Sequence, residues 1–143
     1  MTFSITGGIL IREEFTIRCD DTGKPLEQID GVIEIDHIPY LVEMKWWDQP
    51  IGVPEIGQHM NRLFLRLRGG AVRGMFISYS GFTDTAVQTV KDGLAAGAMI
   101  FMCTLQDFVR LMETKADLGE FCRERIRLTL INKQPYIAPS TKP

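Results

Sequence analysis

Asp30, Glu43 and Lys45 are the residues of this sequence whose types and spacing could support chemistry. Two carboxylates brought together repel each other, and burying them unpaired is costly. A hard divalent cation such as Mg²⁺ removes that cost and keeps bound waters that a phosphate can replace. The ammonium group beside it could orient or deprotonate a metal-bound water, or stabilise the charge that develops on the phosphorus. These residues therefore indicate metal-assisted attack on a phosphate ester.

A β-hairpin would bring the three residues together. We expect one strand over Gly31–Asp36, a tight turn through His37–Ile38–Pro39, and a second strand over Tyr40–Lys45. The start of the first strand in a hairpin lies beside the end of the second, so Asp30 should lie next to Glu43.

Side-chain alternation divides the second strand between two faces of the predicted sheet. The residues fall into two sets: Leu41, Glu43 and Lys45 on one face, and Tyr40, Val42 and Met44 on the other. An isolated E-x-K pattern is short and therefore unspecific. Its other interpretation is a solvated strand face without catalytic function, and the convergence of Asp30 on the pair argues against it.

The order D-(12 residues)-E-x-K, formed by Asp30, Glu43 and Lys45 across a predicted β-turn-β, resembles the signature of the PD-(D/E)XK nuclease superfamily. Two later segments look like the Mrr-type restriction endonuclease branch of that superfamily. Gly52–Glu55 is similar to its V-G-V-P-E-like helix start, and Ser80–Thr83 is similar to its S-G-F-T turn.

The resemblance runs from Gln28 to Glu113 and includes three departures from the family pattern. Ile29 stands where the signature has proline. Glu43 stands where many Mrr-type domains carry glutamine. The family usually also opens with a helix that often bears a glutamate, and we expect that N-terminal helix to be absent because the sequence offers no clear candidate for it.

The resemblance implies an α/β, restriction endonuclease-like fold and a Mg²⁺-dependent endonuclease, with Mn²⁺ as a substitute metal. Such an enzyme hydrolyses DNA phosphodiester bonds and leaves a 5′-phosphate. Asp30, Glu43 and the backbone carbonyl of Met44 would bind the metal, and Lys45 would be the catalytic lysine. The rival hypothesis is a catalytically inactive nucleic-acid-binding or assembly module that keeps the nuclease fold. We prefer the enzyme, because a binding module has no reason to keep a catalytic set.

A helix predicted from Pro54 to Arg68 could supply contacts with DNA. Its apolar residues form one stripe: Ile56, Met60, Leu63, Phe64 and Leu67. The opposite side would carry Gln58, His59, Arg62 and Arg66. Residues 56–83 contain four arginines and no acidic residue, which is compatible with phosphate contacts. A solvated helix face explains the spacing equally well.

The remaining elements are predicted from hydrophobic periodicity and capping residues. Strands are expected over Ile9–Cys19, Val72–Ser78 and Ala98–Cys103. Helices are expected after a cap at Thr83 or Asp84, over Leu105–Glu113 after a cap at Thr104, and from Asp117. The order is then β-β-β-α-β-α-β-α-α, a mixed sheet flanked by helices. Trp46 and Trp47 would cover the rim of the sheet or stack on bases.

Length and composition indicate a single domain over residues 1–133, followed by a flexible C-terminal tail over residues 134–143. The chain is 45% apolar and 24% charged, which is ordinary for a globular protein. Its three cysteines show no C-x-x-C pattern, which argues against a disulfide framework or a zinc site. We expect a cytoplasmic protein with DNA as its partner and no membrane segment. A homodimer and a place in a longer parent protein are both compatible with the sequence.

Overall fold

The computed structural model describes residues 9–10, 16–19, 25–66 and 71–138. Residues up to Asp30, and Arg66, are described by their backbone alone. The strands in these ranges are β1 (Ile9–Leu10), β2 (Thr16–Cys19), β3 (Pro25–Ile35), β4 (Ile38–Lys45), β5 (Arg73–Ser78) and β6 (Ile100–Thr104). The helices are α1 (Val53–Arg66), α2 (Asp84–Ala95), α3 (Leu105–Glu113) and α4 (Leu118–Asn132).

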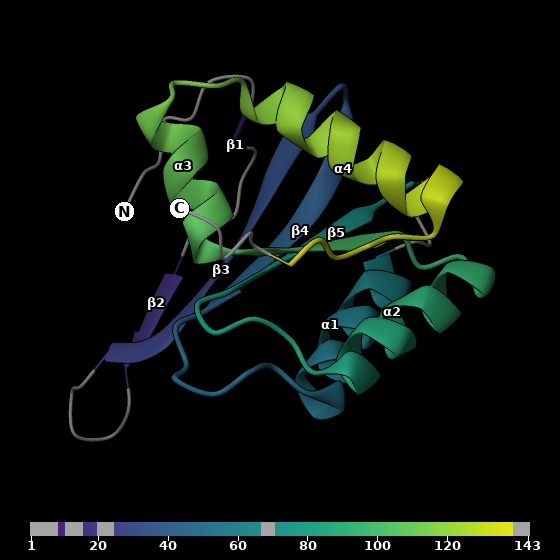
Figure 1. Ribbon diagram of the computed structural model, residues 1–143, viewed down its shortest axis with the longest axis horizontal. Coiled ribbons are helices and arrows are strands. Elements are labelled where there is room, and N and C mark those ends of the chain that lie inside the picture. The colour runs from purple at the N-terminus through teal and green to yellow at the C-terminus, as the bar shows by residue number, and fades with distance from the viewer. Residues whose placement is uncertain (1–8, 11–15, 20–24, 67–70, 139–143) are drawn as a thin grey trace.

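The strands of the described residues form one mixed sheet in the order β1-β3-β4-β5-β6, with β2 also paired to β3 (Figure 1). Strand β3 pairs antiparallel with β1, β2 and β4, whereas β4, β5 and β6 run parallel. Strand β4 therefore has a partner on each side. The predicted mixed sheet flanked by helices is confirmed.

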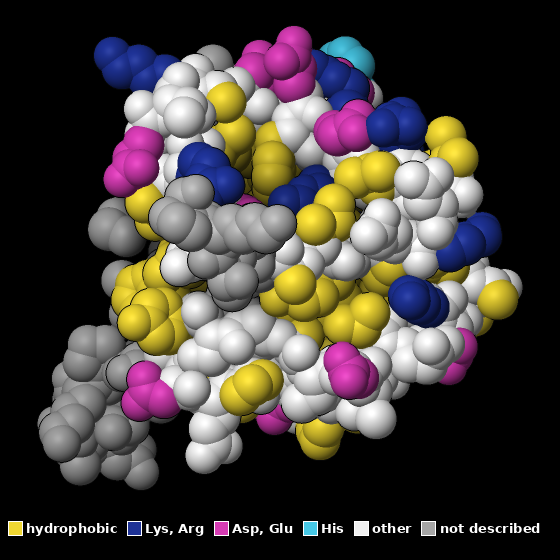
Figure 2. All heavy atoms as spheres, viewed as in Figure 1, with side chains coloured by type: hydrophobic (Ala, Val, Ile, Leu, Met, Phe, Trp, Pro, Cys, Tyr) yellow, Lys and Arg dark blue, Asp and Glu magenta, His cyan; other side chains and the backbone are white. Residues whose placement is uncertain are grey.

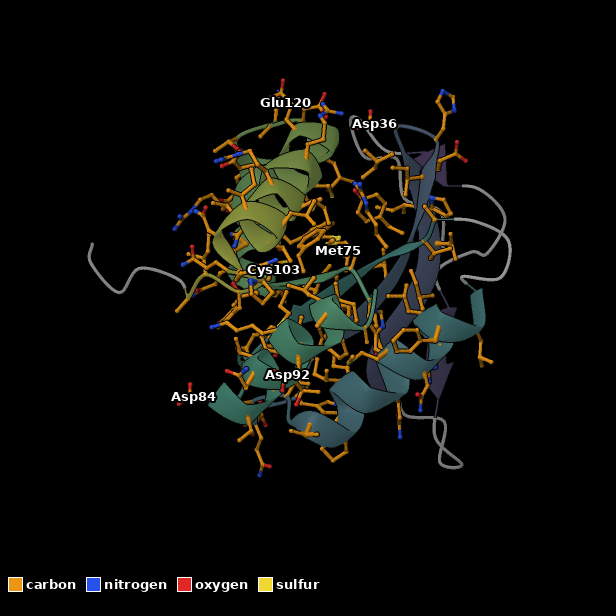
Figure 3. The ribbon with its side chains drawn as sticks, turned by 90° about the vertical axis from the view of Figure 1, so that its right-hand side faces the viewer. Asp36, Met75, Asp84, Asp92, Cys103 and Glu120 are labelled. Atoms are coloured by element: carbon orange, nitrogen blue, oxygen red, sulfur yellow. The ribbon has the colours of Figure 1, made fainter. Side chains whose placement is uncertain are left out.

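Helices cover both faces of the sheet (Figures 1 and 3). Helix α1 connects β4 to β5, and α2 connects β5 to β6, so both crossovers advance across the sheet in the same direction. Right-handed crossovers place such helices on the same face. Helices α3 and α4 follow β6 and cover the opposite face.

The alternation predicted for β4 divides its side chains between two cores. Tyr40, Val42 and Met44 pack with α3 and α4, in the layer where Met75 and Cys103 also lie (Figure 3). Leu41 packs with α1 and α2 on the other face. The face of Leu41 is also the face of Glu43 and Lys45, because side chains two residues apart along a strand share a side.

The turn of the β3–β4 hairpin consists of two residues, Asp36 and His37, with φ angles of 56° and 64°. Two successive positive φ angles are typical of the tight turns that match the twist of paired strands. The predicted turn through His37–Ile38–Pro39 is therefore wrong in its extent. Ile38 and Pro39 belong to β4, where Pro39 lies opposite Glu34.

The structure also corrects the region before the hairpin. The single strand predicted over Ile9–Cys19 is two short strands, β1 and β2, which both pair with β3. β3 itself begins at Pro25, earlier than predicted, because β2 pairs with its first half. Residues 1–8 and 11–15, where an opening helix of the family would be sought, lie outside the described residues.

Side-chain caps begin the helices after β5 as predicted. The Thr83 hydroxyl accepts a hydrogen bond from the backbone N–H of Ala86 at the start of α2. Thr104 and Asp107 form a reciprocal capping box at the start of α3, and Asp117 caps α4. The helix predicted from Asp117 is confirmed as α4. No helix of the described ranges has the length and apolar character needed to cross a membrane.

Part of the predicted C-terminal tail packs on the sheet. The backbone N–H of Met102 in β6 donates to the carbonyl of Pro135, and Tyr136 forms a bridge with Met102. The ring of Tyr136 also packs edge-on against Phe82, with centroids 5.1 Å apart. Residues 134–138 therefore belong to the folded body, whereas residues 139–143 lie outside the described ranges. The predicted end of the first helix, at Arg68, also lies outside the described ranges.

Candidate active site

Asp30 and Glu43 occupy directly opposed positions in the β3–β4 ladder, and Gln28 lies opposite Lys45. Opposed residues on antiparallel strands have Cα atoms about 4.5–5.5 Å apart and belong to the same face of the sheet. The register thus places the Asp30 position beside the Glu43–Lys45 pair, as the hairpin prediction requires.

Glu43 and Lys45 are both buried, with exposed fractions of 2% and 5%. Strand β4 is paired on both sides, and α1 covers this face. Charged side chains are almost never so deeply buried unless they have partners. The interpretation of the E-x-K pattern as a solvated strand face is therefore wrong.

Arg62 of α1 is one partner of Glu43. Its Nη1 donates a hydrogen bond to Glu43 Oε1 over 2.6 Å, and its side chain is 38% exposed. Arg62 was predicted to face phosphate or water from the outer side of the helix. It lies instead at the flank of α1, where it reaches both solvent and the buried carboxylate.

His59 is fully buried, and its prediction as a nucleic-acid contact is wrong. Its Nδ1 lies 3.6 Å from Glu43 Oε2, and its ring packs edge-on against Phe76 with centroids 5.3 Å apart. Burial, the largest cause, and the nearby charges of Arg62 and Lys45 lower the pKa of His59 to about 3. The imidazole is therefore neutral at neutral pH.

The position of His59 depends on a glycine in the neighbouring strand. A Cβ added to Gly74 of β5 would lie 2.7 Å from His59 Nε2, closer than side-chain atoms pack. On α1, His59 follows Ile56 by three residues and precedes Leu63 by four, so it belongs to the buried stripe. Phe64, predicted for that stripe, lies at its edge and is 38% exposed.

Lys45 ends β4 beneath an aromatic ring. Its Nζ lies 4.3 Å from the centre of a Trp47 ring, a distance at which a cation and an aromatic face attract. Trp47 is 37% exposed, whereas Trp46 packs at the border of the α3–α4 core. Trp46 thus covers the rim of the sheet, which is one of the two roles predicted for the tryptophans. Trp47 instead contacts Lys45, the candidate catalytic residue.

Two segments far apart in the sequence meet beside Lys45. Ile51 pairs with Phe82, with backbone hydrogen bonds from Ile51 to Gly81 and from Thr83 to Ile51, both 2.9 Å long. The backbone N–H of Tyr79 donates to the Lys45 carbonyl over 3.0 Å. The two segments that resemble the Mrr-type branch, 52–55 and 80–83, therefore both lie near the end of β4 at Lys45.

The chemistry of the donors at this site fits a hard divalent cation. Glu43 supplies a buried carboxylate that already binds a cationic group, Arg62. The Asp30 position lies opposite, and the Met44 backbone carbonyl is next along β4. Oxygen donors of these kinds are those that Mg²⁺ prefers. Among the side chains that the structure describes, which do not include Asp30, no three acidic, histidine or cysteine residues cluster as a metal site.

Comparison with known proteins identifies one family. A family model for the catalytic domain of Mrr, described as restriction endonuclease, matches residues 4–112 of the 143. The match includes the hairpin, α1, and both segments beside Lys45. Comparisons with curated proteins and with solved structures gave no significant match.

Proposed function

The chain belongs to the Mrr-type restriction endonuclease family, and on this premise we propose that it is a Mg²⁺-dependent endonuclease that hydrolyses DNA phosphodiester bonds and leaves a 5′-phosphate. The observation that supports this proposal best is that Glu43 and Lys45 are both buried, and that Glu43 lies directly opposite Asp30 in the ladder. Burying a carboxylate and an ammonium at a strand end costs free energy. Function is a sufficient reason to retain such a pair, since two apolar residues would pack at lower cost.

Each residue of the site has a role in this proposal. Asp30, Glu43 and the carbonyl of Met44 would hold the metal, which when bound supplies an activated water and a Lewis acid. Lys45 carries the proton chemistry or stabilises charge on the phosphorane-like transition state. The Trp47 ring restricts the ammonium group to one side of the strand end, which pre-orients it for that task.

DNA would approach the site over the outer flank of α1. Gln58 is exposed, Arg62 is partly exposed, and the Arg66 position lies one turn after Arg62. Arginines at this spacing can contact phosphates without reading bases. In the view of Figure 2, basic and acidic side chains are interspersed, so that face does not supply a broad basic surface. Phosphate contacts are expected along α1, because residues 56–83 carry four arginines and no acidic residue.

Binding of Mg²⁺ or Mn²⁺ should raise the Tm of the wild-type protein. A ligand that binds only the folded state stabilises it, by about 2.7 kcal/mol at a concentration one hundred times its Kd. Asp30→Asn and Glu43→Gln should lose most of this response. The measurement is a thermal scan with and without metal. Asp92→Asn, which changes an exposed carboxylate on α2 (Figure 3), serves as the matched control; an equal response in all four proteins would contradict the metal site.

Replacing Arg62 and Arg66 together by alanine should weaken DNA binding by a similar factor on every sequence. Each lost phosphate contact lowers the slope of log affinity against log salt by about 0.9, so the double variant should lose nearly 2. Binding titrations at several salt concentrations measure this slope. If affinity and slope stay unchanged, DNA binds at another surface, and Trp47 becomes the next residue to test.

A further inference from the structure

His59 is a buried polar residue whose presence demands an explanation. It is fully buried between α1 and the sheet, and neither ring nitrogen has a hydrogen-bond partner among the described residues. A buried polar group without a partner costs about 1–3 kcal/mol. A leucine would fill a similar volume without that cost, so the imidazole is retained at the expense of stability.

The ring is held in a fixed place. Gly74 leaves the space that Nε2 occupies, and the edge of the ring contacts Phe76. The Cβ of an alanine at position 74 would also lie 2.8 Å from Ile100 Cγ1, so glycine at this position is what leaves room for the imidazole beside β5. With Nε2 beside Gly74 and the ring against Phe76, Nδ1 is the ring nitrogen that lies near Glu43.

Two nitrogens from successive turns of α1 face the two oxygens of Glu43. Arg62 Nη1 contacts Oε1 at 2.6 Å, and His59 Nδ1 lies 3.6 Å from Oε2. The second distance is slightly too long for a hydrogen bond, and a shift of about 0.5 Å would make one. Arg62 is partly exposed and can leave, whereas His59 is fully enclosed and cannot.

We propose that His59 is a positioning residue for the metal-binding carboxylate of Glu43. When Arg62 leaves Oε1, the Nδ1–H of His59 donates a hydrogen bond to Oε2 and fixes the plane of the carboxylate. Oε1 is then the oxygen presented to the cation. This inference rests on the proposed function, because it assigns a role toward the metal that Glu43 would bind. Groups that orient a metal-binding carboxylate typically change metal affinity by about 10–100-fold when they are lost.

The test compares Mn²⁺ affinity in the wild-type protein, His59→Leu and His59→Asn. The affinity can be measured from the electron paramagnetic resonance signal of free Mn²⁺, without any activity assay. His59→Leu should bind Mn²⁺ about 10–100-fold more weakly. Its metal-free Tm should equal or exceed that of wild type, because the leucine removes two buried nitrogens that lack partners. His59→Asn should recover most of the affinity, since its amide N–H can replace that of Nδ1.

The outcomes separate this inference from the proposed function. If wild type binds Mn²⁺ and His59→Leu binds it equally well, His59 has only a packing role, and the proposed function stands. If His59→Asn binds as weakly as His59→Leu, donation to Glu43 is excluded. If wild type itself does not bind Mn²⁺, the proposed function fails, and the inference fails with it.

A spectroscopic measurement on the wild-type protein covers the case in which the leucine variant does not fold. Proton–nitrogen correlation spectra of the imidazole identify which ring nitrogen carries the proton. With Mg²⁺ present, His59 should carry it on Nδ1. A proton on Nε2 in that state would overturn the proposed hydrogen bond.

Discussion

Replacing Lys45 with methionine should lower the rate of DNA cleavage by about 10²–10⁴-fold, the range typical for loss of an acid–base group. DNA affinity should remain close to that of wild type, because an interaction made only in the transition state affects the chemical step and not binding. Methionine keeps most of the buried volume of Lys45, which is only 5% exposed, and removes the ammonium group. Nicking of supercoiled plasmid with Mg²⁺ measures the rate, and binding with Ca²⁺ in place of Mg²⁺ measures the affinity.

Lys91→Met is the matched control, since Lys91 is an exposed lysine on α2. It should cut and bind like wild type. Loss of DNA affinity in Lys45→Met as large as its loss of cutting would show that Lys45 binds substrate in the ground state. The catalytic role assigned to it would then be wrong.

The rival hypothesis of a binding module makes a different prediction for the wild-type protein. Such a module would bind DNA and cut neither duplex, single-stranded nor branched substrates. The structure describes a buried Glu43–Lys45 pair, which a binding surface does not require. The fold alone does not distinguish the two functions. Cutting by wild type that Lys45→Met abolishes would exclude the module.

The hairpin could be predicted from the sequence because strand alternation and a short turn leave few arrangements. Twelve residues separate Asp30 from Glu43, and a two-residue turn makes those positions directly opposed. The exact turn was predicted too late in the chain. Its two positive φ angles fall on Asp36 and His37, whereas Pro39 suggested a turn and instead occupies β4.

The inner face of α1 could not be fully predicted, because it includes a polar residue, His59. The helical spacing is compatible with burial of His59, but its residue type is not typical of a buried position. Helical residues turn by about 100° each, so His59 lies between Ile56 and Leu63 on the same side. The sequence prediction groups His59 with the polar residues Gln58, Arg62 and Arg66, whereas the structure buries it. The signal that could have placed it is Gly74, a small residue beside the apolar run 75–77 of β5, which makes room for a large side chain from another layer. The contact between Gly74 and His59 of α1 is a tertiary contact, and it cannot be inferred from the local sequence of either element.

Arg62 links these two elements, and its replacement by alanine should destabilise the metal-free protein by about 1–3 kcal/mol. Breaking a buried ion pair typically costs about 3–5 kcal/mol, and the partial exposure of Arg62 reduces that figure. The Tm should fall accordingly in thermal scans without metal. Addition of Mg²⁺ should raise the Tm of Arg62→Ala by more than it raises that of wild type. Under the proposed function, a cation would have to displace the guanidinium group from Glu43 Oε1 in wild type, whereas in the variant it would not.

Arg127→Ala is the control for this effect. Arg127 contacts Glu124 at 2.6 Å, the same distance as the Arg62–Glu43 pair, but both partners are exposed on α4. Its loss should change the Tm little, with or without Mg²⁺, because exposed ion pairs contribute little to stability. A smaller Mg²⁺ response in Arg62→Ala than in wild type would mean that Arg62 supports metal binding. The guanidinium group would then belong to the metal-loaded site, and the displacement assigned to it would be wrong.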